Sequence, residues 1–202
     1  PIENKPKPIP YGRQCIDSAD VAAVTEALLS DWLTTGPRVE AFEEKTAKTA
    51  GVRCGGAVSS GTAALHAAMH AIGIGPEDEV IVPPMTFAAT ANAVVYQGGT
   101  PVFADVQPDT LLLDPETVEA RISSKTRAIV AVDYAGQMCD YDRLQQIAQR
   151  HGLYLVADAC HSIGGQYKGR LSGSCADLSV FSFHPVKHVT TGEGGMVVSD
   201  KI

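Results

Sequence analysis

Short runs of β-type residues alternate with helix-type patterns from about residue 56 onward, and this alternation restricts the fold more than any other feature. Crossover helices with apolar residues at three-to-four spacing are predicted at 62–72, 88–96, 115–122 and 141–151. An order of strand, helix and strand predicts a parallel sheet with right-handed crossovers. Seven β-type runs are present, near 56–60, 79–83, 100–106, 127–134, 153–158, 177–183 and 195–200.

The last run differs from the others in how the chain reaches it. Residues 184–194 are polar, contain glycine and are interrupted by Pro185, so no crossover helix is expected there and the seventh strand should be antiparallel to its neighbour. Two helices are predicted before the sheet, at 18–29 behind a cap at Asp17 or Ser18, and at about 37–50. The fold class is therefore α/β, with a mostly parallel seven-stranded sheet, one antiparallel strand and helices on both faces.

Length and composition predict one globular unit. With 202 residues and 45% hydrophobic content, the chain can bury one large core without disulfides or metal. We divide it into an N-terminal helical segment at 1–50 and an α/β sheet domain at 51–202.

Charge and cysteine content narrow the partners and the compartment. The formal net charge of −7 is dispersed, which argues against nucleic acid and acidic membranes as partners and leaves small molecules or a second copy. The five cysteines are widely spaced and form no Cys-x-x-Cys pair, as expected for reduced thiols in the cytoplasm. The polar, proline-rich start and the lack of an eighteen-residue apolar run speak against export and membrane insertion.

In an open parallel sheet a ligand binds at the carboxyl ends of the strands. After the first run, Ser59 to Ala63 form a small-residue turn that opens a helix, and free backbone N–H groups at such a helix start attract phosphate. The alternative is a Ser or Thr helix cap with nothing bound. The segment has neither the Gly-x-Gly-x-x-Gly spacing nor the Gly-Lys-Ser/Thr of a P-loop, so NAD and nucleoside triphosphates are not indicated.

Two further strand ends carry candidate residues. Phe87 follows the second run, where its ring could cover a flat cofactor or, alternatively, pack in the core. Asp158 ends the apolar fifth run, beside Cys160 and His161. A buried acid needs a cationic partner, which a protonated pyridine nitrogen would provide, although Asp158 could instead cap the next turn.

Lys187 lies in the polar loop after the sixth run. Most lysines are solvated surface charges, yet a lysine held in a crevice can lose its proton and form a Schiff base. His66 and His70 are four residues apart on one helix, but the glutamate of His-Glu-x-x-His and a third ligand are missing, which disfavours a metal site. No Gly-x-Ser-x-Gly elbow occurs, so hydrolase chemistry is a poor fit.

Taken together, four segments closely resemble the DegT/DnrJ/EryC1/StrS family of sugar aminotransferases, and the likeness extends from about Ile9 to Asp200. Four motifs in the right order make chance agreement improbable and override the alternative readings of each residue. The segments are SSGTAALHAAMHAIGIGPEDEVIVPPMTFAATANAV, VDYAGQMCDYDRL, VADACHSIGG and FSFHPVKHVTTGEGGMV.

The resemblance implies an aspartate-aminotransferase-like large domain that binds pyridoxal 5′-phosphate (PLP). It implies that Lys187 forms the Schiff base with the cofactor, that Asp158 pairs with the pyridine nitrogen and that His161 lies near the 3′-oxygen. Phe87 matches the position that stacks on the ring. The phosphate-binding positions are matched by Thr62, Ala63 and Ser182.

The resemblance also implies a reaction. Related dehydratases have histidine in place of the lysine, so Lys187 favours transfer of an amino group from L-glutamate to a sugar ketone. The segment around Lys187 is most similar to enzymes that aminate a UDP-linked 4-keto-6-deoxy sugar, as in pseudaminic acid synthesis, so a role in polysaccharide biosynthesis is expected. A cytoplasmic homodimer is implied, with the family's C-terminal small domain absent from residues 1–202. The rival readings are a 3-aminotransferase, a sugar dehydratase and a non-catalytic PLP-binding or dimerisation module.

Overall fold

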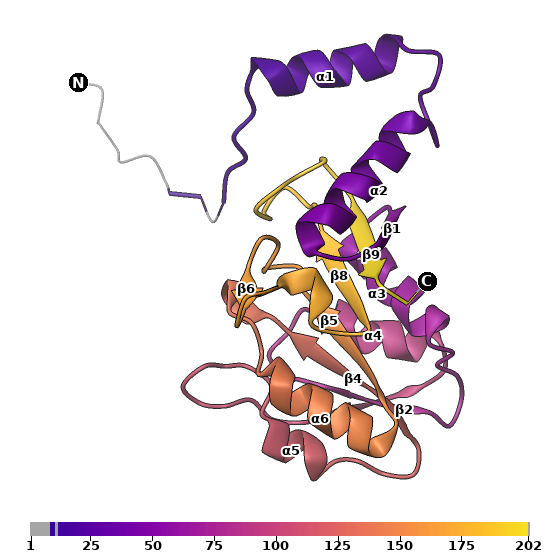
Figure 1. The fold of residues 1–202 in the computed structure, drawn as a ribbon, viewed down its shortest axis with the longest axis vertical. Helices are drawn as coiled ribbons and strands as arrows, with labels where there is room; N and C mark the ends of the chain where they lie inside the picture. The colour runs from indigo at the N-terminus through magenta and orange to yellow at the C-terminus, as the bar shows by residue number, and fades with distance from the viewer. Residues whose placement is uncertain (1–8, 11, 202) are drawn as a thin grey trace, which may run out of the picture.

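The computed structural model describes residues 9–10 and 12–201, and its centre is one mixed sheet of seven strands (Figure 1). The strand order across the sheet is β1-β9-β8-β5-β4-β2-β3. Every pair among β3, β2, β4, β5 and β8 is parallel, whereas β9 runs antiparallel to both β1 and β8. The strands are β1 (Cys54–Val58), β2 (Glu79–Val82), β3 (Thr100–Phe103), β4 (Thr126–Val132), β5 (Tyr154–Asp158), β8 (Leu178–Ser182) and β9 (Gly195–Ser199).

The single antiparallel strand confirms the expectation drawn from the polar loop before it. Residues 183–194 return directly from β8 to β9 without a helix, and so short a connection can only join antiparallel neighbours. All seven predicted runs and all six predicted helices occur, with ends that shift by a few residues. The helices are α1 (Ser18–Leu29), α2 (Pro37–Ala50), α3 (Gly61–Ala71), α4 (Ala89–Tyr96), α5 (Pro115–Glu119) and α6 (Tyr141–His151).

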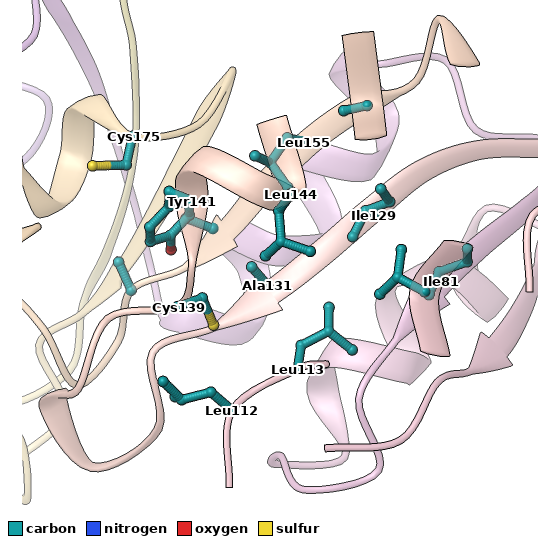
Figure 2. Close-up of a cluster of buried hydrophobic side chains, with 14 of the residues drawn as sticks. Ile81, Leu112, Leu113, Ile129, Ala131, Cys139, Tyr141, Leu144, Leu155 and Cys175 are labelled. Carbon is teal, nitrogen blue, oxygen red and sulfur yellow. The ribbon is translucent and has the colours of Figure 1, made fainter. Parts of the chain in front are cut away.

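Helices cover both faces of the sheet because successive strand residues point to opposite sides. In β4, Ala128 and Val130 belong to the buried cluster beneath α3 and α4. Their neighbours Ile129 and Ala131 belong to a second cluster with residues of α5 and α6. Figure 2 shows this second cluster, in which Leu144 of α6 lies over the strand. The parallel strands are therefore apolar on both faces and read as continuous hydrophobic runs.

One part of the sheet domain was not predicted. Between β5 and β8 the chain forms a small hairpin of two strands with two residues each, β6 (Gln166–Tyr167) and β7 (Arg170–Leu171). The 3₁₀ turn η2 (Ser172–Ser174) follows it. The turn η1 (Tyr134–Gly136) was likewise not predicted, and its first residue was assigned to the end of the preceding strand. Strands of two residues are too short to show an alternation of apolar and polar residues, so the sequence contains no pattern that would predict them.

The first helix stands apart from the sheet. Asp17 caps α1 and forms a capping box with Asp20, which explains why the helix begins at residue 18. No residue of α1 is buried, and Figure 1 shows it projecting away from the strands, whereas α2 packs against β1 and β9. None of the helices in the described part of the chain has the length and apolar character needed to span a bilayer.

Candidate active site

A pocket of about 630 Å³ lies at the carboxyl ends of the parallel strands. Its walls come from residues that follow β1, β2, β4, β5 and β8, as expected for the ligand crevice of a parallel sheet. Six of the seven predicted site residues line it, and together they bring segments more than one hundred residues apart into one cavity. The six are Thr62, Phe87, Asp158, His161, Ser182 and Lys187.

The seventh predicted residue, Ala63, is not part of the pocket wall. Its backbone N–H donates to the side chain of Ser60, which is the N-cap of α3 (3.1 Å). This bond is the helix cap that the sequence offered as an alternative for the segment. The two preceding residues of the first turn, Gly61 and Thr62, do line the cavity, and backbone N–H groups in a first turn have no partner within the helix.

Gly61 lets the start of α3 approach the end of β8 closely. A Cβ at this position would lie 2.8 Å from the Ser182 Cβ and 3.2 Å from the Cys160 Sγ. The close approach brings the hydroxyl-bearing residues Thr62 and Ser182 to the positive end of an eleven-residue helix. Hydroxyl groups and N–H groups gathered at a helix start can hold an anion such as a phosphate.

Asp158 is a buried carboxylate at the end of β5, only 6% exposed. One oxygen accepts a hydrogen bond from the hydroxyl of Thr90 (2.9 Å), and the other accepts from the backbone N–H of Cys160 (3.4 Å). Within residues 9–10 and 12–201, no lysine, arginine or histidine forms an ion pair with it. Capping of the next turn thus accounts for one weak bond and leaves the negative charge without a cationic partner.

The loop that carries Lys187 is closed at its base. The carbonyl oxygen of Phe183 accepts hydrogen bonds from the backbone of Thr191 (3.1 Å) and the hydroxyl of Thr190 (3.0 Å). The Phe183 ring is buried and contacts Phe42 of α2 edge-on, with 4.9 Å between ring centroids. Lys187 is half-buried in the pocket wall and forms no ion pair in the described part of the chain, so its amine is available to a ligand.

Phe87 is 76% exposed at the mouth of the pocket. The alternative that it packs in the core is therefore wrong. An exposed aromatic ring at a pocket mouth is able to cover one face of a flat ligand.

His161 lines the pocket together with Lys187 and Asp158. Burial lowers the pKa of its imidazole, and the nearby positive charge of Lys187 lowers that pKa further, while Asp158 acts in the opposite direction. The lowered pKa favours the neutral imidazole, which can donate or accept a hydrogen bond. Lys187, Asp158 and His161 all line the same cavity.

Sequence reasoning did not assign a role to three further titratable residues of the pocket, Tyr134, His184 and Glu193. Tyr134 follows β4, and its ring meets that of His161 with 6.5 Å between centroids. A signal was present, because the rule about strand ends also applies to β4, but the residue was assigned to the strand itself. Glu193 lies six residues after Lys187 in the same loop. Its position in the pocket depends on how this loop folds, which the sequence does not show.

Comparisons with known proteins agree with this architecture. The family model described as DegT/DnrJ/EryC1/StrS aminotransferase family matches residues 14–201. The spore coat polysaccharide biosynthesis protein SpsC of Bacillus subtilis (strain 168) is 45% identical over 192 residues, which is 95% of this chain and 49% of SpsC.

Solved structures are similar over almost the whole chain. The Streptococcus pneumoniae protein Spr1654, solved in its PLP-form, is 36% identical with a TM-score of 0.93, and the match covers 96% of this chain and 53% of that one. DesI, solved in the presence of its TDP-sugar product, is 45% identical with a TM-score of 0.90, over 96% and 49% of the two chains. The present chain thus spans about half the length of these relatives.

Proposed function

We propose that this chain, which belongs to the DegT/DnrJ/EryC1/StrS aminotransferase family, contributes the cofactor site of an enzyme that transfers an amino group to a sugar. The cofactor of the family is PLP. The observation that carries the proposal is that Asp158 and Lys187, from different strand ends, line one cavity, and that the carboxylate has no ion-pair partner among residues 9–10 and 12–201. A buried negative charge opposite an available amine suits a protonated pyridine ring that carries an aldehyde.

The residues of the pocket fit the parts of PLP. The first turn of α3, with the hydroxyls of Thr62 and Ser182, would hold the phosphate, with the backbone of Ala63 adjoining it. Phe87 would cover one face of the ring. The family resemblance supports the remaining assignments, in which Asp158 would pair with the pyridine nitrogen, His161 with the 3′-oxygen and Lys187 with the aldehyde carbon.

When bound, PLP supplies an electron sink that stabilises negative charge at the α-carbon of the amino donor. The chain's own residues direct this chemistry. The Asp158 carboxylate keeps the proton on the ring nitrogen, because its own charge is buried and needs that partner. The Lys187 amine would act as the base that takes the proton from the α-carbon of the donor and would return it at C4′.

We infer L-glutamate as the donor and a nucleotide-linked 4-keto-6-deoxy sugar as the acceptor. The family and the names of its members support a sugar, and the segment around Lys187 favours a UDP-linked one. DesI binds a TDP-sugar, so the two nucleotides are to be compared directly. The division into a PLP-binding large domain at 1–202 and a small domain outside it stays a prediction, as do the homodimer and the cytoplasmic location.

Labelling of the lysine tests the cofactor site. The protein is incubated with PLP, reduced with borohydride and digested, and the modified peptide is identified by mass spectrometry. We expect the label on Lys187 and its loss in Lys187→Arg. Lys48→Arg, an exposed lysine in the last turn of α2, is the matched control and should keep the label on Lys187. A label on another lysine, or none, would contradict the assignment.

The substrates are tested in the complete natural polypeptide that carries this sequence. UDP- and TDP-linked 4-keto-6-deoxy sugars are supplied with L-glutamate, and formation of 2-oxoglutarate and of the amino sugar is followed. Both products are expected with at least one of the two nucleotides. Formation of a deoxygenated sugar instead would indicate a dehydratase and refute the transfer reaction.

A further inference from the structure

A second buried carboxylate lies behind the pocket, and the chemistry proposed above does not use it. Asp133 follows β4 and is fully buried. One of its oxygens accepts hydrogen bonds from the Cys139 backbone N–H (3.1 Å) and the Tyr141 hydroxyl (2.8 Å). The other accepts from the Ser162 hydroxyl (2.7 Å). The Asp133 carboxylate is thus surrounded by three hydrogen-bond donors. In the described part of the chain it forms no ion pair.

The bonds of Asp133 join two segments that border the pocket. Cys139 and Tyr141 end the loop that begins at Tyr134, and Figure 2 shows both in the core beside β4. Ser162 lies in the tight turn that follows Asp158, a turn closed by its own backbone bond from Ser162 to Ala159 (3.0 Å). One carboxylate therefore holds the loop after β4 and the turn after β5 at a fixed separation.

The loop after β4 needs such a support. Ala135 has φ 54° and ψ 22°, a left-handed conformation that non-glycine residues seldom adopt, and Gly136 follows with φ 87°. A Cβ on Gly136 would lie 3.0 Å from the carbonyl oxygen of His161, so the loop passes directly over the neighbouring turn. Tyr134, directly before this strained backbone, lies at the pocket wall with its ring edge-on to that of His161.

We propose that Asp133 is a positioning residue of the site, which fixes Tyr134 and His161 as a pair through its bonds to Cys139 and Ser162. The proposal rests on the function proposed above, since it assigns to this pair the orientation of the PLP ring. All three partners of Asp133 donate, and the backbone N–H of Cys139 cannot reverse its role, which calls for an acceptor at this position. The burial that raises the pKa of Asp133 to about 6 agrees with a charge held in place by geometry rather than by a cation.

Two substitutions separate positioning from general support of the fold. Ser162→Ala and Tyr141→Phe each remove one hydroxyl donor from the same carboxylate and keep the carbon skeleton. Only Ser162 belongs to the turn that carries His161, whereas Tyr141 begins α6 on the core side. In the complete natural polypeptide, we expect Ser162→Ala to weaken PLP binding about tenfold and to change the circular dichroism band of the bound cofactor. Tyr141→Phe should leave PLP affinity within about twofold of the natural protein and should keep that band.

The carboxylate itself is tested by a conservative and a non-conservative variant. Asp133→Asn keeps an acceptor for Cys139 and should bind PLP better than Asp133→Leu, which has none. Adding Ser162→Ala to Asp133→Leu should cost little further affinity, because the bond between them is already lost. In the cofactor-free protein, the imidazole NMR signals of His161 should move in Ser162→Ala and stay in place in Tyr141→Phe, which gives a reading independent of PLP.

These measurements distinguish a positioning role of Asp133 from a purely structural one. Equal losses of PLP affinity in Ser162→Ala and Tyr141→Phe, with an unchanged dichroism band in both, would overturn the positioning role and leave Asp133 as a structural residue. Additive losses for Asp133→Leu and Ser162→Ala would do the same. Failure of the proposed function is seen separately, as an absence of PLP binding or of the Lys187 label in the natural protein.

Discussion

Replacing Asp133 with Asn should change how the stability of the fold depends on pH. Burial raises the pKa of the Asp133 carboxyl from 3.8 to about 6, although the three donors around it oppose the shift. Between these two values the folded protein holds a proton that the unfolded chain has released. The stability that this group contributes is therefore greatest below the lower value and is lost as the pH rises through the higher one. Asn carries no charge, so the variant lacks this dependence.

The size of the effect follows from the shift. A difference of about two pKa units corresponds to about 3 kcal/mol of unfolding free energy once the carboxyl is fully ionised. About one third of this is already lost at about pH 4.5, so the natural protein should lose about 2 kcal/mol relative to Asp133→Asn between about pH 4.5 and 7.5. The altered hydrogen bonds of the amide add a constant offset between the two proteins, so the slope and not the absolute difference carries the information.

Urea unfolding of the cofactor-free protein, followed by far-UV circular dichroism across this pH range, provides the measurement. Asp109→Asn removes an exposed carboxylate from the turn after β3 and serves as the control for loss of one negative charge. It should retain the pH dependence of the natural protein. A difference between the natural protein and Asp133→Asn that stays flat, or that favours the natural protein as pH rises, would refute a buried, ionising Asp133.

Three further predictions concern the pocket. Gly61→Ala should weaken PLP binding in equilibrium dialysis because its Cβ would lie 2.8 Å from that of Ser182, whereas Gly56→Ala, with no atom near its added Cβ, should bind normally. Phe87→Ala should change the melting temperature of the cofactor-free protein little, because the ring is 76% exposed, yet lower PLP affinity in absorbance titrations; a large loss of stability with normal affinity would contradict its role. Asp158→Asn should reduce kcat for amination at least about 100-fold in steady-state assays because the amide cannot balance a charged ring nitrogen, and an unchanged kcat would exclude that pairing.

Much of the architecture follows from patterns within single segments. Asp17 and its partner Asp20 mark the start of α1, and the alternating environments of β4 residues appear in the sequence as one uninterrupted apolar run. The direction of β9 also follows from local chemistry, because Pro185 and its polar neighbours exclude a crossover helix. Such features depend on interactions between residues that are close in the chain, so they appear as patterns in the sequence.

The candidate site was found in part for the same reason. Asp158 and Lys187 follow apolar runs, and the strand-end rule selects them without knowledge of the fold. Phe87 shows the limit of the rule, since only its exposure separates a ring that covers a ligand from one that fills the core. Tyr134 and Asp133 escaped notice because they read as the end of a strand.

The sequence by itself determined the six α-helices, the seven strands of the central sheet and the strand that reverses direction, because these depend on periodicity and on local hydrogen bonding. Only the tertiary structure decided that β8 lies beside β5 and β9, that the start of α3 reaches Ser182, and that Asp133 joins the turn of Ser162 to the loop of Tyr134. Strand pairing and side-chain packing join residues far apart in the chain, and their free energy depends on all partners at once, so no single segment contains it.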